Sequence, residues 1–171
     1  MTKHELINNI MGQIADTGWD SISLPAQDYI ARKEDFFPFF YEWMAQQHLE
    51  LFVPGGDYDR KEKILEILLV KFELWGSYRA AILELRTEAL GKPKLMRSIL
   101  CADYKFLRRI WVAHGLDGES IISQAKEKGV FLISWAAFFV WIDDTGDDLS
   151  KTMAFIDKAL SFGEQLSENY A

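Results

Sequence analysis

Four aspartates lie close together near the end of the chain, where carboxylates at this density could hold a metal ion: Asp143, Asp144, Asp147 and Asp148. A calcium-binding EF-hand loop needs oxygen ligands at alternating positions and a glutamate at the twelfth, where this chain has Ala154. Carboxylates just before a helix also cap its first N–H groups and interact favourably with its dipole. We therefore expect Asp147 and Asp148 to cap the last helix, and the sequence predicts no metal site.

Three histidines, His4, His48 and His114, are far apart in the sequence, and none has a partner at metal-ligand spacing. We expect His114, which precedes Gly115, to help cap the carbonyl end of a helix. The chain shows no Ser-His-Asp order, no nucleophile elbow and no glycine-rich phosphate loop. The sequence therefore predicts no catalytic residues, no cofactor and a protein that is not an enzyme.

The chain has a single cysteine, Cys101, so no disulfide can form within it, which fits a reducing compartment. Cys101 follows Leu100 on a helical stretch, and we expect a buried, inert thiol. A reactive thiol, favoured by Lys105 one turn away, is the alternative. The first residues, 1–5, lack the pattern of a secretory signal, so we expect a soluble cytoplasmic protein.

Residues 92–109 form the basic segment of a chain whose net charge is −7. Six Lys or Arg residues stand there against one acid, Asp103. One interpretation is a solvated helix face; the other is a contact for anionic lipid headgroups or an acidic partner. The residues of this basic patch are Lys92, Lys94, Arg97, Lys105, Arg108 and Arg109.

Aromatic residues make up 14% of the chain, which is more than a monomer of this size usually buries. This content favours an oligomer interface, an apolar ligand cavity, or both. Helical spacing brings many of these side chains onto shared faces, where an ordinary core is the alternative to a cavity. The predicted ligand-pocket residues are Phe72, Trp75, Met96, Leu100, Leu107, Trp111, Phe131, Trp135 and Phe138.

Apolar residues recur every three or four positions along most of the chain, which predicts an all-α protein without strands. Thr2 and Glu5 fit a capping box, and Gly18 ends the first helix. The apolar run at 130–142 is too short to cross a bilayer and is typical of a buried helix. The expected helices span about 3–17, 35–52, 59–75, 78–90, 94–114, 119–142 and 149–169.

Two motifs near the N-terminus are separated by only four residues, 25–28. An amphipathic helix ends in Gly18–Leu24. The segment Tyr29–Phe37 then contains an aromatic residue, a Lys-Glu pair, an acidic residue and apolar residues, in that order. In this pattern residues 3–53 resemble the N-terminal head of TetR-family regulators, but residues 25–28 leave no room for its helix-turn-helix. Residues 1–60 carry four Lys or Arg against ten Asp or Glu, so we expect DNA not to be the partner.

The rest of the chain matches a second pattern in three stretches: Ile64–Trp75, Leu107–Gly115 and Val140–Lys158. In these stretches residues 63–160 resemble the ubiquinone-biosynthesis accessory proteins, which share the TetR fold and bind lipid in place of DNA. The resemblance implies a TetR-like helical bundle with a shortened helix-turn-helix head at 1–53. It also implies a C-terminal ligand-binding and dimerisation domain at 57–171, after the breaker Pro54–Gly56.

That resemblance further implies a homodimer in which the last two helices of each chain pack against their mates. The expected interface residues are Phe139, Met153, Ile156, Leu160 and Gly163. An apolar cavity would take an isoprenoid or acyl chain, and a partner enzyme would receive the quinone precursor. The resemblance allows peripheral membrane contact, although the chain ends at Ala171 without the family's further amphipathic helix.

Three functional hypotheses follow. The first is a non-enzymatic lipid- or isoprenoid-binding accessory protein of the TetR fold, with ubiquinone biosynthesis as the implied pathway. The second is a TetR-family transcriptional regulator in which a ligand controls DNA binding. The third is a protein–protein adaptor whose aromatic residues all belong to the core and the dimer interface.

Overall fold

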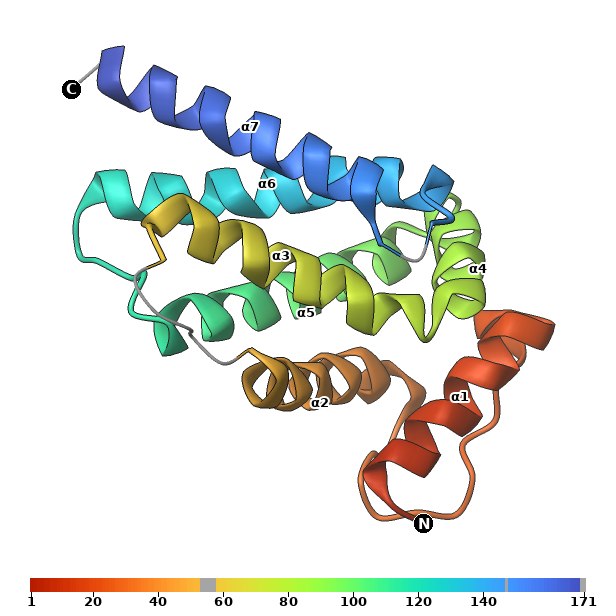
Figure 1. Ribbon diagram of the computed structural model, residues 1–171. Coiled ribbons are helices and arrows are strands. Elements are labelled where there is room, and N and C mark those ends of the chain that lie inside the picture. The colour runs from red at the N-terminus through yellow and green to blue at the C-terminus, as the bar shows by residue number, and fades with distance from the viewer. Residues whose placement is uncertain (53–57, 147, 170–171) are drawn as a thin grey trace. The chain divides into compact units, whose positions relative to one another are not determined.

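The computed structural model describes residues 1–52, 58–146 and 148–169, and within them the chain is all-helical with no strand (Figure 1). The all-α prediction is confirmed. The predicted boundary at 54–56 lies outside the described residues, and the division into head and body stays a prediction. The helices are α1 Lys3–Thr17, α2 Phe36–Leu51, α3 Arg60–Gly76, α4 Arg79–Leu90, α5 Pro93–Ala113, α6 Ile121–Asp143 and α7 Ser150–Asn169, with short 3-10 turns at Trp19–Ser21 and Lys33–Asp35.

The chain forms two compact units that interleave in the sequence. The first unit contains residues 1–47 and 74–106, and the second contains residues 48–73 and 107–171. Each unit therefore combines segments that are distant along the chain, which a reading of local patterns does not reveal.

Helix α1, in the first unit, begins and ends where the sequence predicts. The Glu5 N–H donates to Thr2 Oγ1 over 3.2 Å, and the Thr2 N–H donates to Glu5 Oε2 over 2.6 Å, which completes the capping box. The apolar face of the helix is at most 3% exposed. Its buried residues are Leu6, Ile7, Ile10, Met11 and Ile14.

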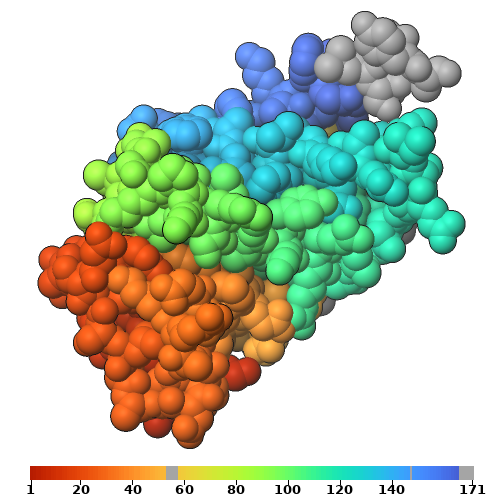
Figure 2. Space-filling view, turned by 180° about the vertical axis from the view of Figure 1, so that it is seen from behind, coloured from red at the N-terminus to blue at the C-terminus, as the bar shows by residue number. Residues whose placement is uncertain are grey.

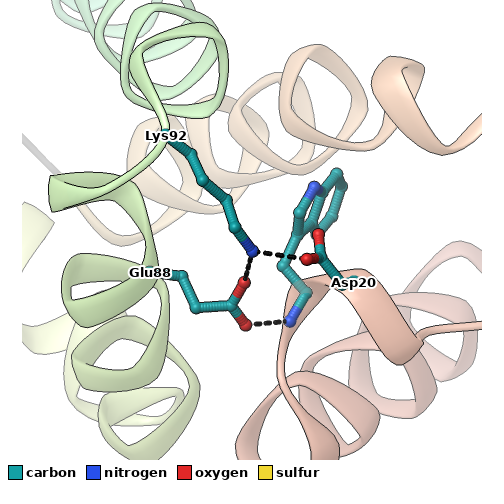
Figure 3. Close-up of polar contacts among 4 residues, drawn as sticks. Asp20, Glu88 and Lys92 are labelled. Carbon is teal, nitrogen blue, oxygen red and sulfur yellow. Dashed lines mark hydrogen bonds and ion pairs between the residues drawn. The ribbon is translucent and has the colours of Figure 1, made fainter.

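A polar corner fixes the end of α1 against α4 in the same unit (Figure 3). The backbone N–H of Trp19 donates to Glu88 Oε1 over 2.5 Å. The Lys92 ammonium contacts the other oxygen of Glu88 and lies 2.6 Å from the Asp20 carboxylate. Gly18 has φ +80°, and a Cβ at this position would overlap the Glu88 carboxylate oxygen. Backbone conformation thus favours glycine at this corner, and a larger residue would also displace the Glu88 carboxylate.

Helix α2 begins close to the start that the sequence predicts, at residue 35. Helix α2 begins at Phe36, one residue later. The Asp35 carboxylate accepts from the Arg32 backbone N–H over 3.2 Å and from its guanidinium over 3.1 Å. Asp35 thereby closes the 3-10 turn before the helix.

In the second unit, α6 and α7 pack along each other, as Figure 1 shows. Asp144 joins them. Its backbone N–H donates to the Trp141 carbonyl over 3.1 Å. Its carboxylate accepts one hydrogen bond from the Thr152 N–H and one from the Thr152 hydroxyl, both over 2.8 Å. Burial favours a higher pKa for Asp144, but the bonds from Thr152 outweigh it and lower that pKa. Asp148 caps Ser150 over 3.2 Å as expected, whereas Asp147 lies outside the described residues.

The thiol of Cys101 is exposed, which contradicts the expectation of a buried one. Its neighbours Ala102 and Phe106 take the buried face of α5 instead, at 4% and 2% exposure. One position along a helix turns a side chain by about 100°, so Cys101 and Ala102 face different surroundings.

We expect Gly18→Ala to destabilise the protein by about 1–3 kcal/mol, because alanine is strained at positive φ and its Cβ would displace Glu88. Urea unfolding followed by circular dichroism measures this. The matched control is Gly12→Ala on α1, where a Cβ meets no atom within 4 Å. It should be neutral or stabilising by up to about 1 kcal/mol. Equal midpoints for the two variants would contradict the role of the corner.

Candidate functional site

A groove of about 740 Å³ opens between α3, α6 and α7 within the second unit. Its volume lies in the range of about 300–1,000 Å³ that small-molecule sites occupy. Three helices contribute to it, and Figure 1 shows α7 running along α6. The lining residues are Arg60, Lys61, Ile64, Ile122, Ala125, Lys126, Gly129, Val130, Ile133, Leu160, Gly163 and Glu164.

Two glycines line the groove, one on each of two neighbouring helices. Gly129 lies inside α6 and Gly163 inside α7, and a Cβ built at either position meets no heavy atom within 4 Å. A glycine in a helix interior costs about 0.5–1 kcal/mol relative to alanine. Neither position shows positive φ or a close backbone approach that would require glycine. What distinguishes them from Gly12, which has the same open space around it, is that they line the groove.

The floor of the groove is apolar. Ile64, Val130 and Leu160 are 5–7% exposed, so their side chains belong both to the core and to the groove wall. Ile122, which also lines the groove, is 65% exposed. A ligand with an apolar chain would remove this surface from water, which is favourable.

Three cations and one acid complete the lining. Lys61 lies 2.6 Å from Asp157, and this hydrogen bond raises the pKa of Lys61. The Arg60 guanidinium donates to the Leu116 carbonyl over 3.0 Å and lies 5.7 Å from the Trp111 ring. Lys126 makes no hydrogen bond or ion pair within the described part of the chain.

The residues predicted for a ligand pocket do not line this groove, and their role as a pocket stays a prediction. Five of them are at most 4% exposed: Phe72, Trp75, Leu107, Trp111 and Phe138. In the second unit their rings pack together, with centroids of Phe72 and Phe138 each 6.0 Å from that of Trp141. Trp135 lies 5.5 Å from Phe138, and Phe131 is half-buried. Trp75, Met96 and Leu100 belong to the first unit.

The residues predicted for a dimer interface divide into exposed and buried ones. Phe139 and Met153 are 57% and 42% exposed, and Gly163 is exposed on the groove. Ile156 and Leu160 are buried within a single chain, at 0% and 6% exposure. The homodimer stays a prediction.

One residue of the predicted basic patch forms ion pairs within the first unit. Lys92 is held by Asp20 and Glu88 in the first unit. The other five residues are exposed on α5, whose side chains reach the surface in Figure 2, in green. Of these, Lys94, Arg97 and Lys105 belong to the first unit, and Arg108 and Arg109 to the second.

The second unit also buries two polar groups that the sequence pattern did not single out. Lys71 is 1% exposed, and its ammonium donates to Ser134 Oγ over 2.8 Å. Both side chains lie on helices with apolar surroundings, where an ion needs such partners.

His48 and His114, distant in the sequence, come together in the second unit with ring centroids 6.1 Å apart. Each ring donates to a backbone carbonyl: His48 Nε2 to Ile67 over 3.0 Å and His114 Nδ1 to Ile110 over 2.8 Å. Desolvation is the main cause that lowers the pKa of His48 from 6.5 to about 4, and the neighbouring His114 and Lys71 act in the same direction. His48 is therefore a buried imidazole whose neutral form is favoured, and the half-buried His114 ring lies beside it.

We expect stability to fall as the pH drops from about 6.5 towards 4, because the unfolded chain then protonates His48 while the folded protein keeps it neutral. The loss from this residue is about 2–3 kcal/mol. Urea unfolding between pH 7.5 and 4.5 measures it. His48→Gln, which retains a donor for the Ile67 carbonyl, should flatten the pH dependence, and His4→Gln at an exposed position should not. An unchanged slope in His48→Gln would contradict this assignment.

Within the described ranges, no three His, Cys, Asp or Glu side chains come together as a metal site, and no helix is long and apolar enough to cross a membrane. Comparison of the chain with protein-family models, with curated proteins and with solved structures gives no match. The findings support an all-helical chain of seven helices in the described residues. The TetR-like arrangement stays a prediction, and no family is identified.

Proposed function

We propose that this protein is a non-enzymatic binding protein for a ligand with a long apolar chain, which lies in the groove between α3, α6 and α7. The observation that carries the proposal is a groove of about 740 Å³ with an apolar floor, lined by a helix-interior glycine on each of two neighbouring helices. Chain burial in such a site contributes about 0.8 kcal/mol per CH₂ group.

The two glycines are the strongest support, because they are unfavourable for the fold taken alone. Alanine at Gly129 and Gly163 would meet no neighbour and would favour both helices. A ligand that uses the vacant space gives these glycines a function. Larger side chains there would occupy the volume that a chain of methylene groups needs.

The lining residues support binding in preference to chemistry. None of them is Ser, Cys or His, the side chains that most often act as nucleophile or as its partner base. The resemblance of residues 63–160 to lipid-binding accessory proteins of the TetR fold supports the same class of function. Within that resemblance, the ligand would be an isoprenoid or acyl lipid and the pathway ubiquinone biosynthesis.

Native mass spectrometry of gently purified protein, followed by organic extraction, tests the proposal directly. We expect a bound apolar molecule at near-stoichiometric level. Protein that carries no such molecule, and that binds no twelve-carbon chain in calorimetry, would overturn the proposal.

Gly129→Leu and Gly163→Leu should each abolish or weaken ligand binding at least about tenfold, because the leucine fills the groove. Neither should destabilise the protein, since leucine is a better helix former than glycine. Calorimetry and urea unfolding measure the two effects separately. Gly12→Leu on α1, another open helical glycine, is the matched control and should bind as the wild type does.

A further inference from the structure

The charges around the groove point to the head group of its ligand. We propose that the groove selects a chain that ends in a single negative charge, such as a carboxylate, and that Lys126 and Arg60 hold this group. The inference rests on the proposed function, because it concerns the same groove. It names the class of ligand as monoanionic amphiphiles, of which a long-chain fatty acid is the simplest.

The groove is cationic on an acidic protein. Three basic residues, Arg60, Lys61 and Lys126, line it against one acid, Glu164, whereas the whole chain carries a net charge of −7. Lysine and arginine at the edge of an apolar site attract an anionic group and orient the chain attached to it. A neutral or cationic head group would make no use of this arrangement.

The three basic side chains differ in how many of their donors are already bonded within the chain. Lys61 is paired with Asp157 at 2.6 Å, so that the two charges cancel. The Arg60 guanidinium has five N–H donors, and one of its nitrogens donates to the Leu116 carbonyl. Lys126 has no ion pair or hydrogen bond among the described residues, and its ammonium brings three donors.

The acid on α7 sets the charge of the head group. Glu164 lines the same groove as Arg60 and Lys126, so these three side chains leave one net positive charge. A carboxylate neutralises that charge. A phosphate monoester, with nearly two negative charges at neutral pH, would leave an excess facing Glu164. The arrangement therefore favours a carboxylate over a phosphate.

Calorimetry with four twelve-carbon probes tests the inference: dodecanoate, 1-dodecanol, dodecyl phosphate and dodecyltrimethylammonium, each below its aggregation threshold. We expect dodecanoate to bind roughly tenfold more tightly than dodecanol, with an affinity that falls as salt rises. Dodecyl phosphate should bind more weakly than dodecanoate, and the cation weakest of all. Phosphate binding tighter than carboxylate would overturn the assignment of a monoanion.

A pair of lysine variants on α6 locates the effect. Lys126→Met keeps the apolar stem and removes the charge, so dodecanoate should bind about tenfold more weakly while dodecanol is unaffected. Lys128→Met is the matched control, because Lys128 is exposed on the same helix and does not line the groove. It should leave both affinities unchanged.

The outcomes separate this inference from the proposed function. Equal binding of dodecanoate and dodecanol, unchanged in Lys126→Met, would overturn the head-group assignment while leaving the apolar groove intact. No binding of any probe would overturn the proposed function itself. Loss of dodecanoate binding in both lysine variants would show a general charge effect and would also overturn the role of Lys126.

Discussion

The buried carboxylate of Asp144 is the contact on which the second unit depends. It lies where α6 ends and accepts two hydrogen bonds from Thr152 in the first turn of α7, so one side chain fixes the start of the second helix against the end of the first. Leu149, with φ 51°, completes the reversal between the two helices. Because α6 and α7 then run along each other, their separation and the groove between them follow from this junction.

The pair α6 and α7 is closely packed in one part and borders the open groove in another. Trp141 on α6 and Ile156 on α7, in the parts of these helices nearer to Asp144, are fully buried. Further away, Gly129 and Gly163 present no side chain at all, and the helices leave space between them. The apolar walls that remain would otherwise favour closure, since apolar surface is stabilised by removal from water. Under the proposed function, a ligand with an apolar chain would cover this surface.

Several charged groups inside each unit are held by other residues of the chain. In the first unit Glu88 binds the Trp19 N–H and the Lys92 ammonium. One of the six cations of the basic segment 92–109 therefore has a structural role. In the second unit Lys71 is held by Ser134. The cation that stays uncommitted at the groove is Lys126, which is why the electrostatics of the site centre on it.

Local sequence patterns by themselves determined the helices and several of their ends, because capping and glycine stops act within a few residues: Thr2 with Glu5, and Gly18, lie where they were expected. The groove was decided only by tertiary structure. Helix α6 is apolar nearly all round, so its pattern contains no phase that tells which face another helix covers. Five of the residues expected to form a pocket are buried and none of the nine lines the groove, so their role as a pocket stays a prediction. The groove has two glycines in its lining, and it exists only once α3 and α7 are placed around α6.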